Sequence, residues 1–267
     1  MAALLSLANA SASAQQIAAV WPLIGGDVAS EAAARIDTAP ALVSPPIMPR
    51  MAAELALNVF QQRSAAQSAQ LGGSSDTTII KAELPDSQQR GEYELKRFYE
   101  APRNLSFSPI RFVGDGFMRS NVMVRLLQSE VQHVEKGHGT DTALSEANYK
   151  FSYKGTDVLN GELLHVYAIK PRRKAPGLFK GKIYLNAFTG SIRRAEGSLV
   201  KSPSVLIKKV EFVQDYADIG PFTFPVHLRS ISKVRVIGRA IVDIFHRDIE
   251  TRSARAISAA SASPGAN

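Results

Sequence analysis

The stretch Pro171–Gly197, PRRKAPGLFKGKIYLNAFTGSIRRAEG, indicates how the second half of the chain folds. Two segments with strand-like composition flank the four residues Phe188–Ser191. Gly190, the third of these four, can take the positive φ that a tight turn requires. We therefore expect a β-hairpin whose turn lies at Phe188–Ser191.

A cluster of positive charge precedes this hairpin. Residues 170–182 contain six lysines and arginines and no acidic residue. Because burying an unpaired cation is costly, we expect this loop to lie in water at the rim of the sheet. The sequence leaves a second interpretation open, in which an anionic membrane surface or an acidic partner contacts Arg172, Arg173 and Lys174.

Apolar and polar residues alternate with a period of two through most of the chain from Gly91 onward, which is typical of an antiparallel sheet with one covered face. In residues 92–100 the alternation puts Tyr93, Leu95 and Arg97 on one face. The segment 117–137 is long enough for a helix, but its β-branched content and alternation favour strands. The later strand segments are YKFSYKG, ELLHVYAIKP, FKGKIYLNA, SIRRAEGSL, IKKVEFVQDY, FTFPVHLRSI and KVRVIGRAIVDIFHRDIE.

One amphipathic helix is expected before the sheet. Pro49 stands just ahead of the segment PRMAAELALNVFQQRSAAQSAQL, and Gly72-Gly73 follows it. One stripe at helical spacing contains Ala52, Leu55, Ala56, Val59 and Phe60. This helix should therefore lie on an apolar surface.

The composition limits the possible classes of protein. The chain has 267 residues, of which 45% are hydrophobic, so it can bury a sizeable core. A net charge of +8 fits weak affinity for anionic surfaces and does not by itself predict a nucleic-acid site. The absence of cysteine excludes disulfides, cysteine-ligated metal sites, thiol catalysis and a lipid-modified N-terminal cysteine. No stretch reaches the roughly 18 apolar residues that cross a bilayer.

The two ends of the chain differ in composition from its middle. A short apolar stretch at residues 4–7 precedes Ala12-Ser13-Ala14, which is typical of a signal peptide at residues 1–14 and predicts export to the periplasm. The alternative is an Ala-rich leader without fixed structure. Residues 15–49 are expected to form a flexible linker, residues 50–251 one domain, and residues 252–267 a disordered tail.

No catalytic signature is present in the sequence. It contains no G-x-S-x-G elbow, no phosphate-binding loop and no H-E-x-x-H pair, and its histidines are scattered. His165 lies inside an apolar strand, where we expect it to be hydrogen bonded rather than catalytic. Asp215 and Asp218 could form an acid–base pair, but we expect them to shape the turn before Gly220. We expect neither an enzyme nor a bound cofactor.

Aromatic residues recur in the strand segments. They can be plain core, but a curved sheet that does not close encloses an apolar cleft, and such clefts bind apolar ligands. The residues expected to line this cleft are Phe107, Phe112, Phe151, Tyr167, Tyr184, Phe212 and Phe224.

The second half of the chain resembles the outer-membrane lipoprotein-sorting protein family, which comprises periplasmic carriers of the LolA/LolB-like fold. The resemblance extends over residues 88–250 and is strongest over residues 149–232. It rests on a strand ending in Lys170-Pro171, a Gly-Lys-Ile-Tyr strand, Thr189-Gly190 followed by Arg193-Arg194, and Gly220-Pro221-Phe222 leading to Phe224-Pro225. The resemblance implies a mainly β fold, an antiparallel unclosed half-barrel with a helical lid that holds acyl chains in its concavity.

Two hypotheses of function follow. The first is a periplasmic carrier, expected as a monomer, that buries the acyl chain of a lipid or lipoprotein and meets a partner protein at the inner or outer membrane. The alternative is a periplasmic sensor or scaffold that binds an envelope protein on the same fold.

Overall fold

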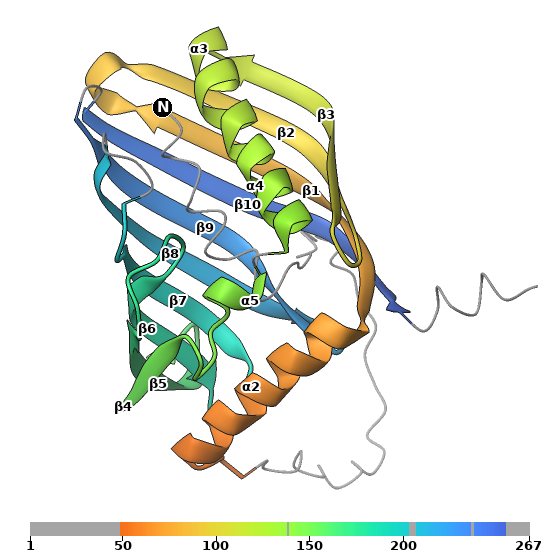
Figure 1. The fold of residues 1–267 in the computed structure, drawn as a ribbon, viewed down its shortest axis with the longest axis vertical. Coiled ribbons are helices and arrows are strands. Elements are labelled where there is room, and N and C mark those ends of the chain that lie inside the picture. The colour runs from red at the N-terminus through yellow and green to blue at the C-terminus, as the bar shows by residue number, and fades with distance from the viewer. Residues whose placement is uncertain (1–48, 138, 203–206, 236–237, 255–267) are drawn as a thin grey trace, which may run out of the picture.

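The computed structural model describes residues 49–137, 139–202, 207–235 and 238–254. A ten-stranded antiparallel sheet dominates this part of the chain, in the order β3-β2-β1-β10-β9-β8-β7-β6-β5-β4 (Figure 1). The first and last strands, β1 (Leu71–Leu84) and β10 (Gly238–Ser253), pair inside the sheet. The two edges are β3 (Asn104–Gly114) and β4 (Tyr149–Leu159), so the sheet is a half-barrel that does not close, as expected.

Most of the expected strands are present. Where KVRVIGRAIVDIFHRDIE was expected to be one strand, β9 ends at Val234 and β10 begins at Gly238. Strand β1 was not expected from the sequence. The expected signal peptide, nearly all of the expected linker and residues 255–267 of the expected tail lie outside the described residues. Arg252 and Ser253, which were expected in that tail, belong to β10 instead. The remaining strands are β2 (Gln89–Glu100), β5 (Glu162–Pro171), β6 (Phe179–Asn186), β7 (Ile192–Leu199), β8 (Ile207–Ile219) and β9 (Phe222–Val234).

The expected N-terminal helix is confirmed as α2 (Ala53–Gln70), which contacts β6 and β9. Of its expected apolar stripe, Ala56 and Phe60 are buried, but Leu55 is 51% exposed, so the stripe is narrower than the sequence predicts. Its buried Phe60 joins the main apolar cluster. The Gln67 side chain forms two hydrogen bonds with the backbone of Thr223: its Oε1 accepts from N at 2.8 Å, and its Nε2 donates to O at 3.0 Å. Apolar packing and these hydrogen bonds together fix α2 against β9.

The segment 117–137 is helical, so the prediction of strands there is wrong. It forms α3 (Gly116–Met118), one π-helical turn η2 (Arg119–Met123) and α4 (Val124–Lys136), ending at Gly137 with φ +67°. Its buried residues recur every three or four positions, which is the helical period: Met118, Val122, Met123, Leu126 and Leu127. That period outweighs the β-branched content. The segment packs over β1, β2 and β3, and Figure 1 shows it crossing that part of the sheet.

The hairpin expected at Pro171–Gly197 is confirmed by the pairing of β6 with β7. Gly190 has φ +67°, as the turn requires. A Cβ at Gly190 would lie 2.8 Å from Val59 Cγ1 of α2, so the turn also needs glycine for this close contact. No helix among the described residues is both long and apolar enough to cross a membrane.

Candidate apolar-ligand site on the concave face

The concave face of the sheet is apolar over most of its width. Alternate residues of the strands point to this side, where they form one cluster with the inner faces of the helices. Two glycines, Gly181 and Gly197, pair across β6 and β7. A Cβ at Gly181 would lie 1.8 Å from the Glu196 carbonyl oxygen, and one at Gly197 would lie 2.2 Å from that of Lys180. Glycine at both positions therefore allows the close approach of the two strand backbones at this pair.

A buried ionic cluster holds α4 to this face. The Arg97 side chain is 2% exposed and donates from Nη2 and Nε to Glu130 Oε1 of α4, at 2.9 and 3.2 Å. Arg97 Nη1 lies 3.6 Å from Asp76 Oδ2 on β1. Burial alone would lower the pKa of Arg97, but Glu130 and Asp76 raise it above its ordinary value. Arg97 is therefore charged and joins two strands to the helix.

Asp76 is the fully buried end of this cluster. Its Oδ1 lies 3.0 Å from His246 Nδ1 on β10 and accepts a hydrogen bond from Thr78. Burial would raise the pKa of Asp76, yet His246 and Arg97 hold it below the ordinary range. The carboxylate thus stays ionised inside the protein because the Arg97 guanidinium, the His246 ring and the Thr78 hydroxyl surround it.

The structure brings together five of the seven aromatic residues expected to bind a ligand. Tyr167 and Phe212 are buried in the concave cluster, while Phe107, Phe112 and Phe151 are partly buried against it. Tyr184 packs with Leu164 and Val166 in a separate cluster. Phe224 packs with Leu71 and Phe222 in a third. Tyr184 and Phe224 therefore do not join the other five, because alternation along a strand sends neighbouring side chains to opposite faces.

The start of α2 is tethered to β5 by polar groups. The Tyr167 hydroxyl donates to Ala53 O at 2.5 Å, and burial, with Tyr153 and Glu54 nearby, raises the pKa of Tyr167 to about 12. His165 Nε2 lies 3.0 Å from Met51 O, and its Nδ1 lies 3.2 Å from the Tyr153 hydroxyl. His165 is thus the hydrogen-bonded sheet residue that the sequence predicts.

Asp215 and Asp218 do not form an acid–base pair. Asp218 flanks the turn at Gly220 and accepts a hydrogen bond from the Thr223 hydroxyl across it, whereas Asp215 lies further from the turn. Both lie in β8, where Asp215 accepts from Arg194 Nε at 2.6 Å. Asp218 binds Arg193 at 2.8 Å and Arg63 of α2 at 3.2 Å. The two carboxylates serve different arginines. The part of the chain that the structure describes contains no group of three or more His, Asp or Glu side chains placed to hold a metal ion.

The cationic loop after β5 is exposed, and two of its arginines have partners. Arg172 Nε donates to Glu146 O at 2.6 Å. Arg173 donates to Asn148 Oδ1 and to Asp141 O, both at 2.7 Å. Lys174 is exposed. The two arginines therefore brace the segment that leads from α5 (Gly139–Thr142) into β4.

Comparison with known proteins gives distant structural neighbours. No family profile and no curated protein matches the sequence. A DUF1329 family protein from Desulfovibrio piger has a TM-score of 0.41 at 10% identity, covering 74% of this chain and 92% of that one. A putative outer membrane lipoprotein-sorting protein domain from Vibrio parahaemolyticus has a TM-score of 0.37 at 15% identity, covering 75% and 94%.

A LolA superfamily protein from Nitrosomonas europaea has a TM-score of 0.36 at 12% identity, covering 76% of this chain and 94% of that one.

Proposed function

We propose that this protein binds the acyl chain of a lipid or lipoprotein on the concave face of its sheet and acts as a carrier in the periplasm. One observation carries the proposal: an unclosed sheet presents a continuous apolar face, and two separate helical segments cover it. Helix α2 covers β6 and β9, whereas α3, η2 and α4 cover β1, β2 and β3. Each CH₂ group buried there contributes about 0.8 kcal/mol, so one long acyl chain binds without any covalent step.

The α3–α4 segment is the part of the cover that moves in this proposal. Gly114, with φ +123°, precedes it, and Gly137 follows it. Its apolar stripe occupies the surface that a ligand would take, so displacement exchanges one apolar contact for another and also separates Glu130 of α4 from Arg97. Release then requires a partner, at the inner or outer membrane, that offsets the burial of the chain.

Native mass spectrometry and lipid extraction of protein purified from a periplasmic fraction test this function directly. The expected result is a co-purifying lipid or acylated peptide. Titration with a fluorescent fatty-acyl probe supplies the second readout. A wild-type protein that carries no lipid and binds no acyl probe refutes the proposal.

Two matched variants locate the site. Phe151→Ser removes a partly buried ring from the concave cluster, and we expect it to weaken probe binding about fivefold to tenfold, which corresponds to roughly 1–1.4 kcal/mol. Ile231→Ser is the control, because Ile231 is 41% exposed and pairs with Ile241 away from that cluster. It should leave probe binding unchanged. Equal losses in both variants would place binding elsewhere.

A further inference from the structure

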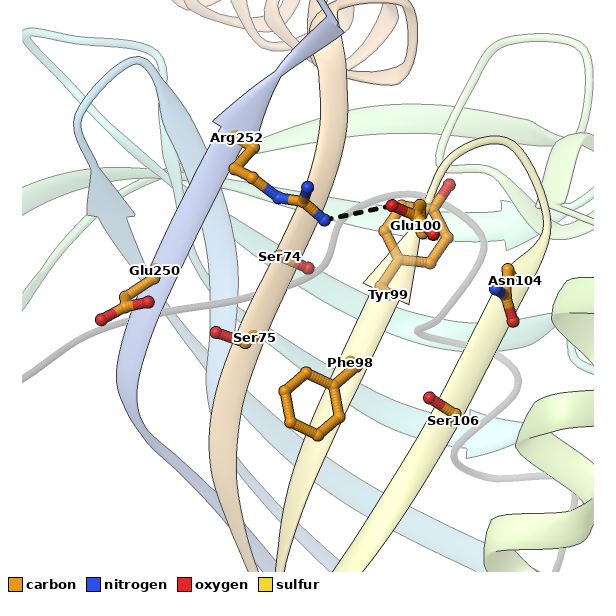
Figure 2. A pocket seen from close by; sticks show the side chains of 9 residues that line it. All are labelled: Ser74, Ser75, Phe98, Tyr99, Glu100, Asn104, Ser106, Glu250 and Arg252. Atoms are coloured by element: carbon orange, nitrogen blue, oxygen red, sulfur yellow. Dashed lines mark hydrogen bonds and ion pairs between the residues drawn. The ribbon is translucent and has the colours of Figure 1, made fainter. Parts of the chain in front are cut away.

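A pocket of about 310 Å³, lined mostly by residues with polar side chains around the Phe98 ring, lies at one end of β10, β1, β2 and β3, outside the apolar cluster (Figure 2). Its volume is at the lower end of the roughly 300–1,000 Å³ typical of small-molecule sites. Neither the apolar-ligand site nor the ionic cluster uses the side chains that the pocket presents on the outer side of the sheet.

The register of the four strands sets side chains in a row across the pocket. Glu250 pairs with Ser75, Ser75 with Phe98, and Phe98 with Ser106. Their neighbours Asp76 and Arg97 point to the concave side, so this row points the other way. Phe98 is 45% exposed, and Figure 2 shows its ring between Ser75 and Ser106. The row thus presents an accessible aromatic ring with a hydroxyl on either side and a carboxylate at its end.

A second row lies two residues further along the strands. Arg252 and Glu100 both pair with Gly73, and Glu100 also pairs with Asn104. Arg252 Nη2 donates to Glu100 Oε1 at 3.3 Å (Figure 2). A Cβ at Gly73 would lie 3.1 Å from Arg252 Nη2, so glycine leaves room for the guanidinium to cross to Glu100. This row adds an amide and an ion pair beside the exposed ring.

We propose that this pocket binds a neutral saccharide, with one pyranose ring stacked on Phe98. The C–H face of a pyranose is weakly positive and suits the negative face of an aromatic ring. The hydroxyls at the edge of the sugar can then donate to Glu250 and Glu100 and accept from Asn104, Ser75 and Ser106. Such a set of a few polar groups around one apolar platform is what orients a small ligand.

The charges of the pocket favour a neutral ligand over an anion. Glu100 and Glu250 bring two negative charges, while Arg252 brings one positive charge that is already paired with Glu100. An acidic ligand would meet net repulsion. A purely apolar ligand would leave the surrounding carboxylates and hydroxyls without hydrogen-bond partners, which costs binding energy. This inference does not depend on the proposed acyl-chain function, because the side chains in question lie outside the concave cluster.

Saturation-transfer NMR and titration calorimetry with cellobiose and N,N′-diacetylchitobiose test the proposal on the full chain. We expect wild type to bind at least one of them with a Kd in the millimolar range or below, with saturation strongest on ring protons of the stacked face. Phe98→Ala should raise Kd at least about tenfold, and Glu250→Gln at least about threefold. Ile231→Ala is the control, since Ile231 is 41% exposed and lies outside this pocket, and it should change Kd less than about twofold.

Three results would overturn the assignment. The first is no saturation transfer from wild type to either disaccharide at millimolar concentration. The second is a Phe98→Ala protein that binds as tightly as wild type while its circular dichroism shows an intact fold. The third is a wild-type dimer and a Phe98→Ala monomer in sedimentation, in which case the row is a self-association surface rather than a saccharide site.

Discussion

Replacing Arg97 by methionine should strongly destabilise the protein. The guanidinium is 2% exposed and lies between Glu130 of α4 and the fully buried Asp76 of β1. Methionine fills a similar volume but removes the guanidinium, so that Asp76 keeps only its contacts with Thr78 and His246. Removing one partner of a buried ion pair costs about 3–5 kcal/mol, because the other charge stays buried. For a domain of this size that corresponds to a fall in Tm of roughly 6–20 °C.

A second variant separates the helix contact from the strand contact. Glu130→Gln keeps an acceptor for Arg97 and leaves Asp76 to balance its charge. The Glu130 side chain is 13% exposed, so water screens part of the lost attraction, and we expect a smaller cost of about 1–2 kcal/mol. The free energy of unfolding lost in the double variant should be about 1–3 kcal/mol smaller than the sum of the two single losses, as expected for residues in contact.

Urea unfolding at pH 7, followed by circular dichroism, measures these free energies, and an unchanged m-value shows that the comparison is valid. Amide hydrogen exchange over residues 124–136 reports whether α4 loosens first. An Arg97→Met protein within about 1 kcal/mol of wild type, below the range for breaking a buried pair, would refute the argument. If the loss in the double variant equals the sum of the two single losses, Arg97 and Glu130 do not stabilise the protein through a shared interaction.

Three further predictions concern acid, the β6–β7 turn and the cationic loop. Burial alone would raise the pKa of Asp76, but His246 and Arg97 lower it below the unfolded value of about 3.9. The ionised carboxylate therefore stabilises the fold fully above that unfolded pKa, and this stabilisation is lost as pH falls through the lower folded pKa. Urea titrations from pH 5 to pH 2 should show this loss in wild type and not in Asp76→Asn. Gly190→Ala should lower the free energy of unfolding by about 1–2 kcal/mol more than Gly161→Ala. Both glycines have positive φ, but a Cβ at Gly190 would lie 2.8 Å from Val59 Cγ1, whereas one at Gly161 meets nothing within 4 Å. Equal losses in the two variants would mean that the turn does not constrain α2. Neutralising all three cations of residues 172–174 should lower the free energy of unfolding by about 1–2 kcal/mol, because it removes the hydrogen bonds of Arg172 and Arg173, whereas neutralising Lys174 alone should change it by less than about 0.5 kcal/mol. Co-sedimentation of the Lys174 variant with anionic vesicles at low and high salt shows whether the loop also recognises a membrane surface.

The elements predicted correctly are those with local signals. The hairpin follows from a Gly-containing turn between two strand-like segments, and α2 follows from one apolar stripe. The segment 117–137 carries conflicting local signals, because Val122, Val124 and Val131 favour strands while the spacing of its buried residues is helical. Packing against the sheet decides in favour of the helix, and residue propensity cannot show that.

The ionic cluster and strand β1 escaped prediction for one shared reason. The inward residues at the start of β1 are Ser74, Asp76 and Thr78, so the strand lacks the apolar alternation that marks the others. Their partners, Arg97 and His246, are distant in sequence and meet them only when β1 pairs with β2 and β10. One signal was present, since the alternation already put Arg97 on the face of Tyr93 and Leu95. A cation on an otherwise apolar face predicts a buried acidic partner, but not which residue supplies it.

An unclosed sheet exposes two strand edges, and each carries a feature that opposes pairing with another chain. In β3, Pro109 lacks a backbone donor and stands beside a register shift opposite Glu94 and Leu95. In β4, Gly155 has φ +106° at a shift opposite Tyr167 and Val166, which interrupts the regular ladder. Exposed apolar side chains at an edge, such as Ile110 at 53% exposure, favour pairing with another chain, and these two features oppose that pairing. Because neither edge presents a regular ladder, the half-barrel can remain open without recruiting further strands. The two edges, β3 and β4, therefore stay unpaired at opposite ends of one continuous sheet.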